Sequence, residues 1–210
     1  MNNVAKILLE IKAVTLSPKE PYTFTSGLKS PIYCDNRLLI SYPDFRTKII
    51  DEFINLIKEH NPTFDIVGGT ATAGIPHAAW IAERLKKPMI YIRGASKEHG
   101  KKNRIEGKLE KGQTVLVIED LISTGGSSVS AVEGVREAGG EVMDCYAIFT
   151  YELEKAKKKF VEANCQLRTL TTFSELIATA KDNNNITPEE AAITQEWNKD
   201  PVEWGKKYGK

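Results

Sequence analysis

The chain has 210 residues, of which 41% are hydrophobic and 27% are charged, and its formal net charge is only +1. This length suits one large α/β domain with a real core and is short for two. The near-neutral charge gives no support for a protein that binds nucleic acids or membrane surfaces. No stretch of the sequence is long and apolar enough to span a membrane.

Three widely spaced cysteines, Cys34, Cys145 and Cys165, show no CxxC motif. An odd number of separated thiols fits a reduced cytoplasmic protein better than a disulfide framework. The N-terminal segment MNNVAKILLEIKA is too charged for a signal peptide. Its apolar residues instead recur at the spacing of an amphipathic helix: Val4, Ile7, Leu8 and Ile11. We therefore expect a cytoplasmic α/β protein.

Apolar periodicity predicts alternating strands and helices along the rest of the chain, after an irregular or short-stranded segment at 22–36. The expected strands are 64–67, 89–92, 115–118, 141–150 and 166–171. The expected helices are 43–60, a helix ending at about Lys86, 128–138, 152–163, 173–181 and one that Thr187 caps. This alternation implies a mostly parallel central sheet flanked by helices on both faces, in a single domain over 1–210.

The most informative stretch is VLVIEDLISTGGSS, from Val115 to Ser128. Its apolar, β-branched start is typical of a strand that is buried on both faces. Unpaired carboxylates are costly inside a strand, so we expect Glu119 and Asp120 at its carboxyl end, where the chain leaves the sheet. The small residues that follow lead into a helix, and a loop of this kind offers free amides to a phosphate.

A second small-residue loop, 69–74, also follows a predicted strand. It has the glycine spacing of a nucleoside triphosphate-binding loop, but Ile75 stands where that motif requires Lys, and no dinucleotide motif follows any strand. The acids before the other loop would disfavour a phosphate unless they bound something else, and ribose hydroxyls or a magnesium ion are natural partners. This predicts a ribose 5-phosphate site; the alternative is a surface turn with an acidic start.

The same stretch resembles the phosphoribosyl diphosphate (PRPP) signature of the type I phosphoribosyltransferases. Three further segments occur in the family's order and point to its orotate-specific members, over at least Thr25 to Tyr151: TSGLKSPIYCDNR, GGTATAGIPHAAW and YIRGASKEHGKKNRIEG. The resemblance implies transfer of the ribose 5-phosphate group of PRPP to orotate, giving orotidine 5-monophosphate and diphosphate for pyrimidine (UMP) biosynthesis. It also implies Mg²⁺ bound through PRPP, an N-terminal hood region at about 1–40, a mobile loop at about 94–112 and a homodimer with shared active sites.

The resemblance assigns roles to individual residues. Arg93, Lys97 and His99 match positions that contact the diphosphate, although composition alone would make their loop a solvated connector. Glu119 and Asp120 match the ribose-binding acids, and Lys97, His99 and Asp120 are the candidate catalytic residues. The remaining positions match the PRPP phosphate cradle: Leu121, Ile122, Ser123, Thr124, Gly125, Gly126 and Ser127.

For orotate, the resemblance implies contacts from Ser123 and from the backbones of Tyr33 and Cys34. Lys29 or Arg37 could meet the orotate carboxylate. The chain departs from other members at three positions that are basic in some of them: Ala73, Gly94 and Tyr151.

Two alternative functions stay open. One is a phosphoribosyltransferase for another base, and the other is a PRPP-sensing regulator, which would want an additional DNA-binding domain or a basic face. The other conspicuous side chains are expected to have structural roles in packing, at a helix end or in an interface: His60, His77, Trp80, Trp197 and Trp204.

Overall fold

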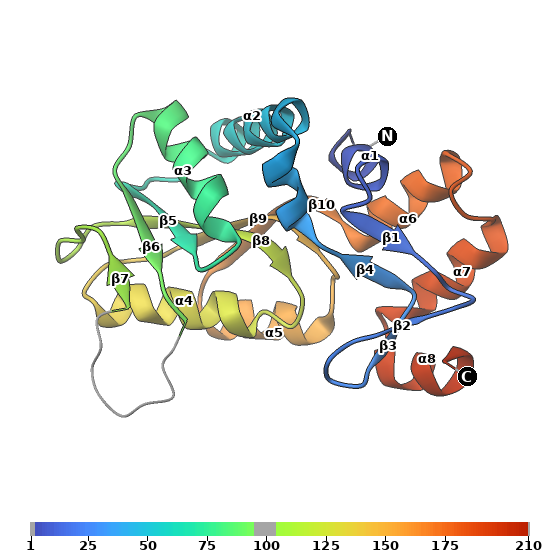
Figure 1. Ribbon diagram of the computed structural model, residues 1–210. Coiled ribbons are helices and arrows are strands. Elements are labelled where there is room, and N and C mark those ends of the chain that lie inside the picture. The colour runs from blue at the N-terminus through green and yellow to red at the C-terminus, as the bar shows by residue number, and fades with distance from the viewer. Residues whose placement is uncertain (1–2, 95–103, 210) are drawn as a thin grey trace.

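A computed structural model describes residues 3–94 and 104–209. Its centre is a six-stranded sheet of order β10-β9-β8-β5-β6-β7 (Figure 1). The strands are β5 (Ile66–Thr70), β6 (Met89–Ile92), β7 (Ile105–Glu106), β8 (Val115–Ile122), β9 (Asp144–Thr150) and β10 (Gln166–Thr172). Neighbouring strands are parallel except for the antiparallel pair β6–β7. The predicted mostly parallel sheet is confirmed.

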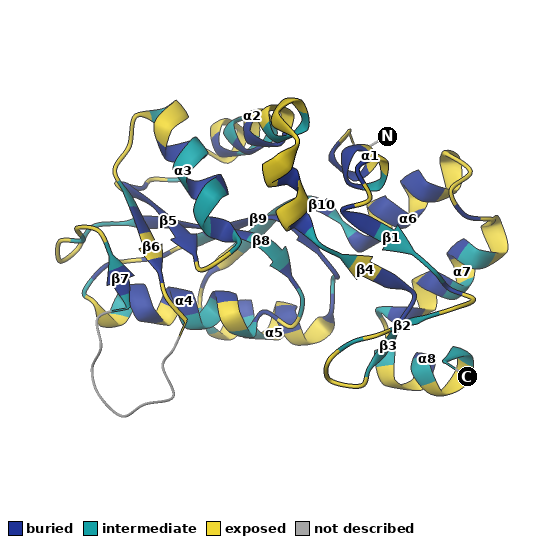
Figure 2. Cartoon of the chain, in the orientation of Figure 1, coloured by how far each residue is buried: buried dark blue, intermediate teal, exposed yellow. Residues whose placement is uncertain are grey.

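Helices cover both faces of this sheet, with α2 and α3 on one side and α4 and α5 on the other (Figure 1). The helices are α1 (Asn3–Glu10), α2 (Pro43–His60), α3 (Gly74–Leu85), α4 (Gly126–Glu137), α5 (Glu154–Glu162), α6 (Phe173–Asp182), α7 (Pro188–Trp197) and α8 (Pro201–Tyr208). Strand β8 shows why its apolar run is continuous: Leu116 and Ile118 join the core on the α2 side, and Val115 and Val117 join the core on the α4 side. Figure 2 shows that most of the central sheet is buried between the two layers of helices.

The hood region contains two short pairs of antiparallel strands, a 3₁₀ helix and the helix α1. Strand β1 (Val14–Leu16) pairs with β4 (Ile32–Cys34), β2 (Tyr22–Thr23) pairs with β3 (Lys29–Ser30), and the 3₁₀ helix η1 covers Asn36–Ser41. Helices α7 and α8 pack beside it: the indole of Trp197 donates to the Lys29 carbonyl at 2.9 Å, and that of Trp204 donates to the Ile193 carbonyl at 2.7 Å. Both tryptophans are buried, as predicted for packing residues.

Several predicted boundaries were wrong. Strand β5 runs through Gly68 and Gly69 to Thr70, because it lies so close to β8 that a Cβ on Gly68 would be 2.6 Å from Cγ1 of Val115. Strand β8 continues through both acids to Ile122, so Glu119 and Asp120 do not stand where the chain leaves the sheet. Helix α8 was not predicted.

The segment expected to be a mobile loop is partly ordered against the sheet. Ile105 pairs with Ile92 and is buried, and Leu109 packs against the core on the α4 side. Ile105 and Leu109 therefore attach this segment to its own subunit, although most of residues 104–112 are exposed, as their polar composition predicts. Residues 95–103, which include Lys97 and His99, lie outside the described residues.

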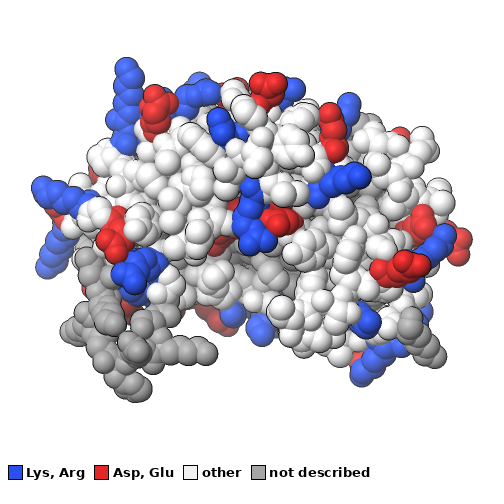
Figure 3. Space-filling view, in the orientation of Figure 1, with Lys and Arg blue, Asp and Glu red and all other residues white. Residues whose placement is uncertain are grey.

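Basic and acidic side chains are interspersed on the face shown in Figure 3, in agreement with the net charge of +1. Within the described ranges, no helix combines the length and hydropathy that a membrane crossing requires.

Candidate active site

A pocket of about 340 Å³ opens at the carboxyl ends of β5 and β8. Its walls are the 71–73 loop after β5, the end of β8 and the loop that leads into α4. Most of the predicted PRPP-binding residues line it: Glu119, Asp120, Leu121, Ser123, Thr124, Gly125, Gly126 and Ser127. Ile122 is fully buried beneath the pocket, and its carbonyl accepts from the Tyr151 amide at 3.0 Å. The structure therefore brings the acid pair and the small-residue loop into one cavity.

The loop into α4 keeps its backbone amides available. Gly125 is the N-cap of α4 and has a φ of 73°, a left-handed conformation that favours glycine, and no side chain caps the helix. The first amides of a helix have no partner within it, and the helix dipole makes this end positive. Together these features make the start of α4 a suitable site for a phosphate.

The 71–73 loop is held against β8 by close contacts. The Thr70 hydroxyl donates to the Ile118 carbonyl at 3.0 Å, and a Cβ on Gly74 would collide with the same carbonyl. The peptide between Ala71 and Thr72 is cis. Small side chains line this wall, so a ligand can approach the backbone closely.

The surroundings of the acid pair disfavour its ionised form. Glu119 is only 6% exposed, and its carboxylate accepts from Ser128 Oγ and from the Asp120 amide, each at 3.1 Å. Burial and the neighbouring Asp120 raise the pKa of Glu119 to about 8, and burial also raises the pKa of Asp120. Neither acid forms an ion pair with a described residue. Hydroxyl donors or a cation would therefore be favourable ligands here.

One buried amide joins the hood region to this acid pair. Asn36 is fully buried, and its Nδ2 donates to the Asp120 carbonyl at 2.7 Å. The Cys34 thiol donates to Asn36 Oδ1 at 3.3 Å. Sequence reasoning missed Asn36, because nothing in its local pattern distinguishes it from a turn residue.

The candidate orotate-binding cations have different surroundings. Arg37 forms a bidentate pair with Asp35 at 2.6 and 2.8 Å, and it directly follows Asn36, whose side chain bonds the Asp120 carbonyl. The stem of Lys29 instead packs on α8, where a Cβ on Gly209 would be 2.7 Å from its Cγ. Tyr33 is 44% exposed, and its ring packs against Tyr22.

Other expected residues lie outside the pocket. Arg93 pairs with Glu106 at 3.2 Å and does not line the cavity. Tyr151 is buried, and its ring packs against Phe149 and Trp197. His77 is fully buried on α3 with neither ring nitrogen hydrogen-bonded, and burial lowers its pKa to about 4. This agrees with its expected packing role.

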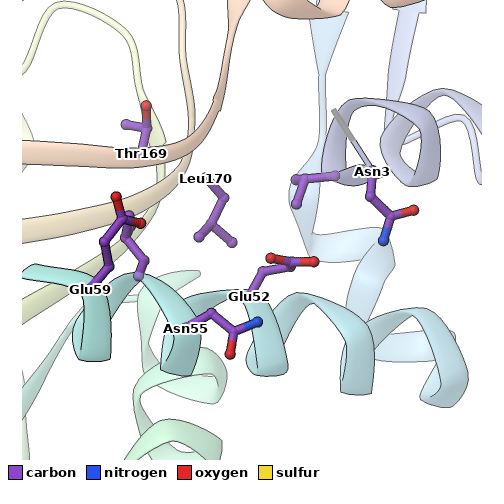
Figure 4. Close-up of a pocket in the computed structure, with 8 residues that line it drawn as sticks. Asn3, Glu52, Asn55, Glu59, Thr169 and Leu170 are labelled. Carbon is purple, nitrogen blue, oxygen red and sulfur yellow. The ribbon is translucent and has the colours of Figure 1, made fainter. Parts of the chain in front are cut away.

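A second pocket, of about 240 Å³, lies between α1, α2 and β10 (Figure 4). Its lining residues are Asn3, Val4, Glu52, Asn55, Leu56, Glu59, Thr169 and Leu170. None of these residues was a site candidate, and the pocket shares no residue with the one at the carboxyl ends of β5 and β8.

Comparison with known proteins identifies the relatives of this chain. Residues 43–181 match the family model of the phosphoribosyl transferase domain. The orotate phosphoribosyltransferase of Listeria innocua is 57% identical over 203 residues, or 97% of each chain, and that of Coxiella burnetii is 55% identical over 201 residues, or 96% of each chain.

Solved structures agree with these sequence matches. The orotate phosphoribosyltransferase of Aeropyrum pernix superposes with a TM-score of 0.76 at 28% identity and covers 84% of this chain and 97% of its own. The UMP synthase of Leishmania donovani superposes with a TM-score of 0.80 at 29% identity over 93% of this chain, which spans 41% of that protein.

Proposed function

We infer that this chain, which belongs to the phosphoribosyltransferase family and within it to the orotate phosphoribosyltransferases, transfers the ribose 5-phosphate group of PRPP to orotate. The products are orotidine 5-monophosphate and diphosphate, so the enzyme is a pentosyl-transferring glycosyltransferase of pyrimidine biosynthesis. The observation that carries this function is the single pocket that holds both the acid pair and the uncapped start of α4. The similarity to orotate phosphoribosyltransferases over nearly the whole chain disfavours the two alternatives, a phosphoribosyltransferase for another base and a PRPP-sensing regulator.

The roles of the pocket residues are part of our proposal. The 5-phosphate binds the amides of 123–127, Glu119 and Asp120 accept hydrogen bonds from the ribose hydroxyls, and the 71–73 backbone approaches the diphosphate. Breaking the anomeric C–O bond places positive charge on the ribose ring and negative charge on the leaving diphosphate. The reaction therefore needs donors on the diphosphate and a site without water, more than a strong base.

We assign the diphosphate donors to Arg93, Lys97 and His99, of which the last two lie outside the described residues. In the described structure Arg93 is paired with Glu106, so it must exchange this partner for the diphosphate. A single donor that acts in the transition state is worth about 3–4 kcal/mol, or 10²–10³ in rate.

For orotate, we propose contacts from the Ser123 hydroxyl and from the backbones of Tyr33 and Cys34. Arg37 is a better candidate than Lys29 for the orotate carboxylate, because it directly follows Asn36, which bonds the Asp120 carbonyl, whereas the stem of Lys29 packs on α8. Orotate would then bind between the hood region and the ribose site.

We propose that Mg²⁺ is held through PRPP and diphosphate. The acid pair fits an ion that arrives with the substrate, because its two carboxyl groups have no cationic partner within the described ranges. Those ranges also contain no cluster of three His, Cys, Asp or Glu that could hold a metal. When bound, Mg²⁺ neutralises charge on the diphosphate.

The base is tested directly. The protein is incubated with PRPP, Mg²⁺ and a panel of bases, and the consumption of each base is followed. We expect loss of orotate absorbance only when PRPP and a divalent cation are both present. Consumption of uracil or hypoxanthine with orotate untouched would contradict the assignment.

We further propose that the chain is a single domain that works in the cytoplasm as a homodimer with shared active sites. One core cluster extends from Val4 to Trp204, which supports a single domain, and all three cysteines are free thiols, which supports a reducing compartment.

A mixture of the inactive variants Lys97→Ala and Asp120→Ala tests the shared site. If the loop acts across the dimer, subunit exchange restores about a quarter of the wild-type sites. If subunit exchange is verified and no activity returns, the proposal that the loop acts across the dimer is refuted.

A further inference from the structure

Helix α5 lies directly against the loop that leads into α4. A Cβ on Gly125 would be 3.3 Å from Cα of Ala156 and 3.4 Å from the ring of Phe160. Residues three positions apart share a face of a helix, so Lys159 lies on the same side of α5 as Ala156. The helix therefore presents a lysine to the phosphate cradle.

The Lys159 ammonium lies beside the first residue of α4. A Cβ on Gly126 would be 3.0 Å from Nζ of Lys159 and 3.9 Å from the hydroxyl of Thr124. Gly126 also lines two cavities, the PRPP pocket and a pocket of about 340 Å³ between α4 and α5, which Lys159 lines as well. The ammonium therefore lies where the two cavities meet, close to the hydroxyl that lines the PRPP pocket.

The ammonium meets two opposing helix dipoles. Lys159 stands in the last turn of α5, where a cation is favourable, whereas the uncapped start of α4 carries a partial positive charge that repels it. Lys159 forms no ion pair with a described residue, although Glu133 and Glu162 line the same pocket between α4 and α5. An anion at the start of α4 would turn this repulsion into attraction.

We propose that Lys159 is a further binding residue of the active site, whose Nζ donates a hydrogen bond to the 5-phosphate of PRPP. This inference rests on the proposed function, because the cradle must hold that phosphate. Of the three consecutive lysines, Lys157 pairs with Glu154 at 2.7 Å and Lys158 is exposed. Only Lys159 faces the cradle.

The test compares Lys159→Gln, Lys159→Arg and the matched control Lys158→Gln with the wild type. A charge-assisted hydrogen bond is stronger than a neutral one, so Lys159→Gln should raise the KM for PRPP about tenfold. The kcat, the KM for orotate and the thermal midpoint should stay at wild-type values. Lys159→Arg should restore most of the PRPP affinity, and Lys158→Gln should behave as wild type.

Competitive inhibition locates the effect within the site. Ribose 5-phosphate occupies the cradle, so its inhibition constant should rise about tenfold in Lys159→Gln. Diphosphate binds at the other end of the PRPP site, so its inhibition constant should not change. An unchanged KM for PRPP, or equal losses for both inhibitors, would overturn the role of Lys159. A wild type that consumes no orotate would instead overturn the proposed function.

Discussion

Replacing Glu119 by Gln should remove a pH dependence of stability that the buried acid creates. The ordinary pKa of a glutamate is 4.5, and burial beside Asp120 raises that of Glu119 to about 8. Between these values the native protein keeps a proton that the unfolded chain has released. The native state then binds more protons than the unfolded state, so the free energy of unfolding falls as the pH rises.

The size of the effect follows from the shift. One pKa unit corresponds to about 1.36 kcal/mol, so the wild type should lose about 4 kcal/mol between low pH and pH 8 through this group alone. The amide introduced by Glu119→Gln keeps the shape of the side chain and has no proton to lose. Ser128 Oγ, which donates to the carboxylate at 3.1 Å, can rotate to accept from this amide.

Urea unfolding at several pH values measures the difference between the two proteins. We expect nearly equal stability at about pH 4, and an advantage for Glu119→Gln that approaches about 4 kcal/mol at about pH 8. The Glu119 side chain also acts on the pKa of Asp120, so the difference between the two proteins reports on the acid pair and not on Glu119 alone. Parallel stability profiles over this range would refute the argument that burial keeps the proton on Glu119.

Three more predictions concern single positions. Asp120→Ala should abolish PRPP use and leave the thermal midpoint almost unchanged, because Asp120 lies at the pocket and outside the core; early melting with full activity would contradict this. Gly125→Ala should lower the free energy of unfolding by about 1–2 kcal/mol, since an L-residue at a φ of 73° is strained and its Cβ would press on Ala156. Denaturant unfolding measures this loss, and the KM for PRPP shows whether the cradle is disturbed. Burial lowers the pKa of His77 from 6.5 to about 4, so between these values acid protonates the unfolded chain and not the native protein. The wild type should therefore become less stable as the pH falls from about 7 to about 4, and His77→Leu should not, so the difference between them should grow in favour of the variant. A constant difference between His77→Leu and the wild type in thermal unfolding across that range would contradict the last prediction.

The parts of the fold that depend on local pattern could be predicted from the sequence. The helix 43–60 and the strand 89–92 agree with the structure at both ends, because their apolar periods are clear and a proline or a left-handed residue marks the boundary. Thr187 caps α7 with the expected capping box. Each of these features is decided by residues within a few positions of one another.

The sequence-based predictions were wrong or incomplete where contacts between residues far apart in the sequence determine the structure. Strand β8 continues through Glu119 because a hydrogen bond from Ser128 offsets part of the cost of burying a carboxyl group. Asn36 reaches the Asp120 carbonyl across 84 positions of the chain. Lys159 looks like one of three solvated lysines until α5 is packed against Gly125. Local sequence contains no signal for contacts of this kind, so the site could be located from sequence but not completed.

The bonds between the hood region and helices α7 and α8 have a consequence for synthesis on the ribosome. Strand β3 is made early, yet the Lys29 carbonyl receives its partner only from Trp197, and the stem of Lys29 packs on Gly205 and Gly209. Earlier parts of a chain leave the ribosome, and can begin to fold, while later parts are still being translated. The core on the α4 side of the sheet, whose last member along the chain is Leu167, can therefore form before residues 188–208 leave the exit tunnel. The core on the α2 side must wait for Ala191, Trp197 and Trp204. A nascent chain stalled before α7 would bury one face of its sheet and leave the other face, and the hood region beside it, incomplete.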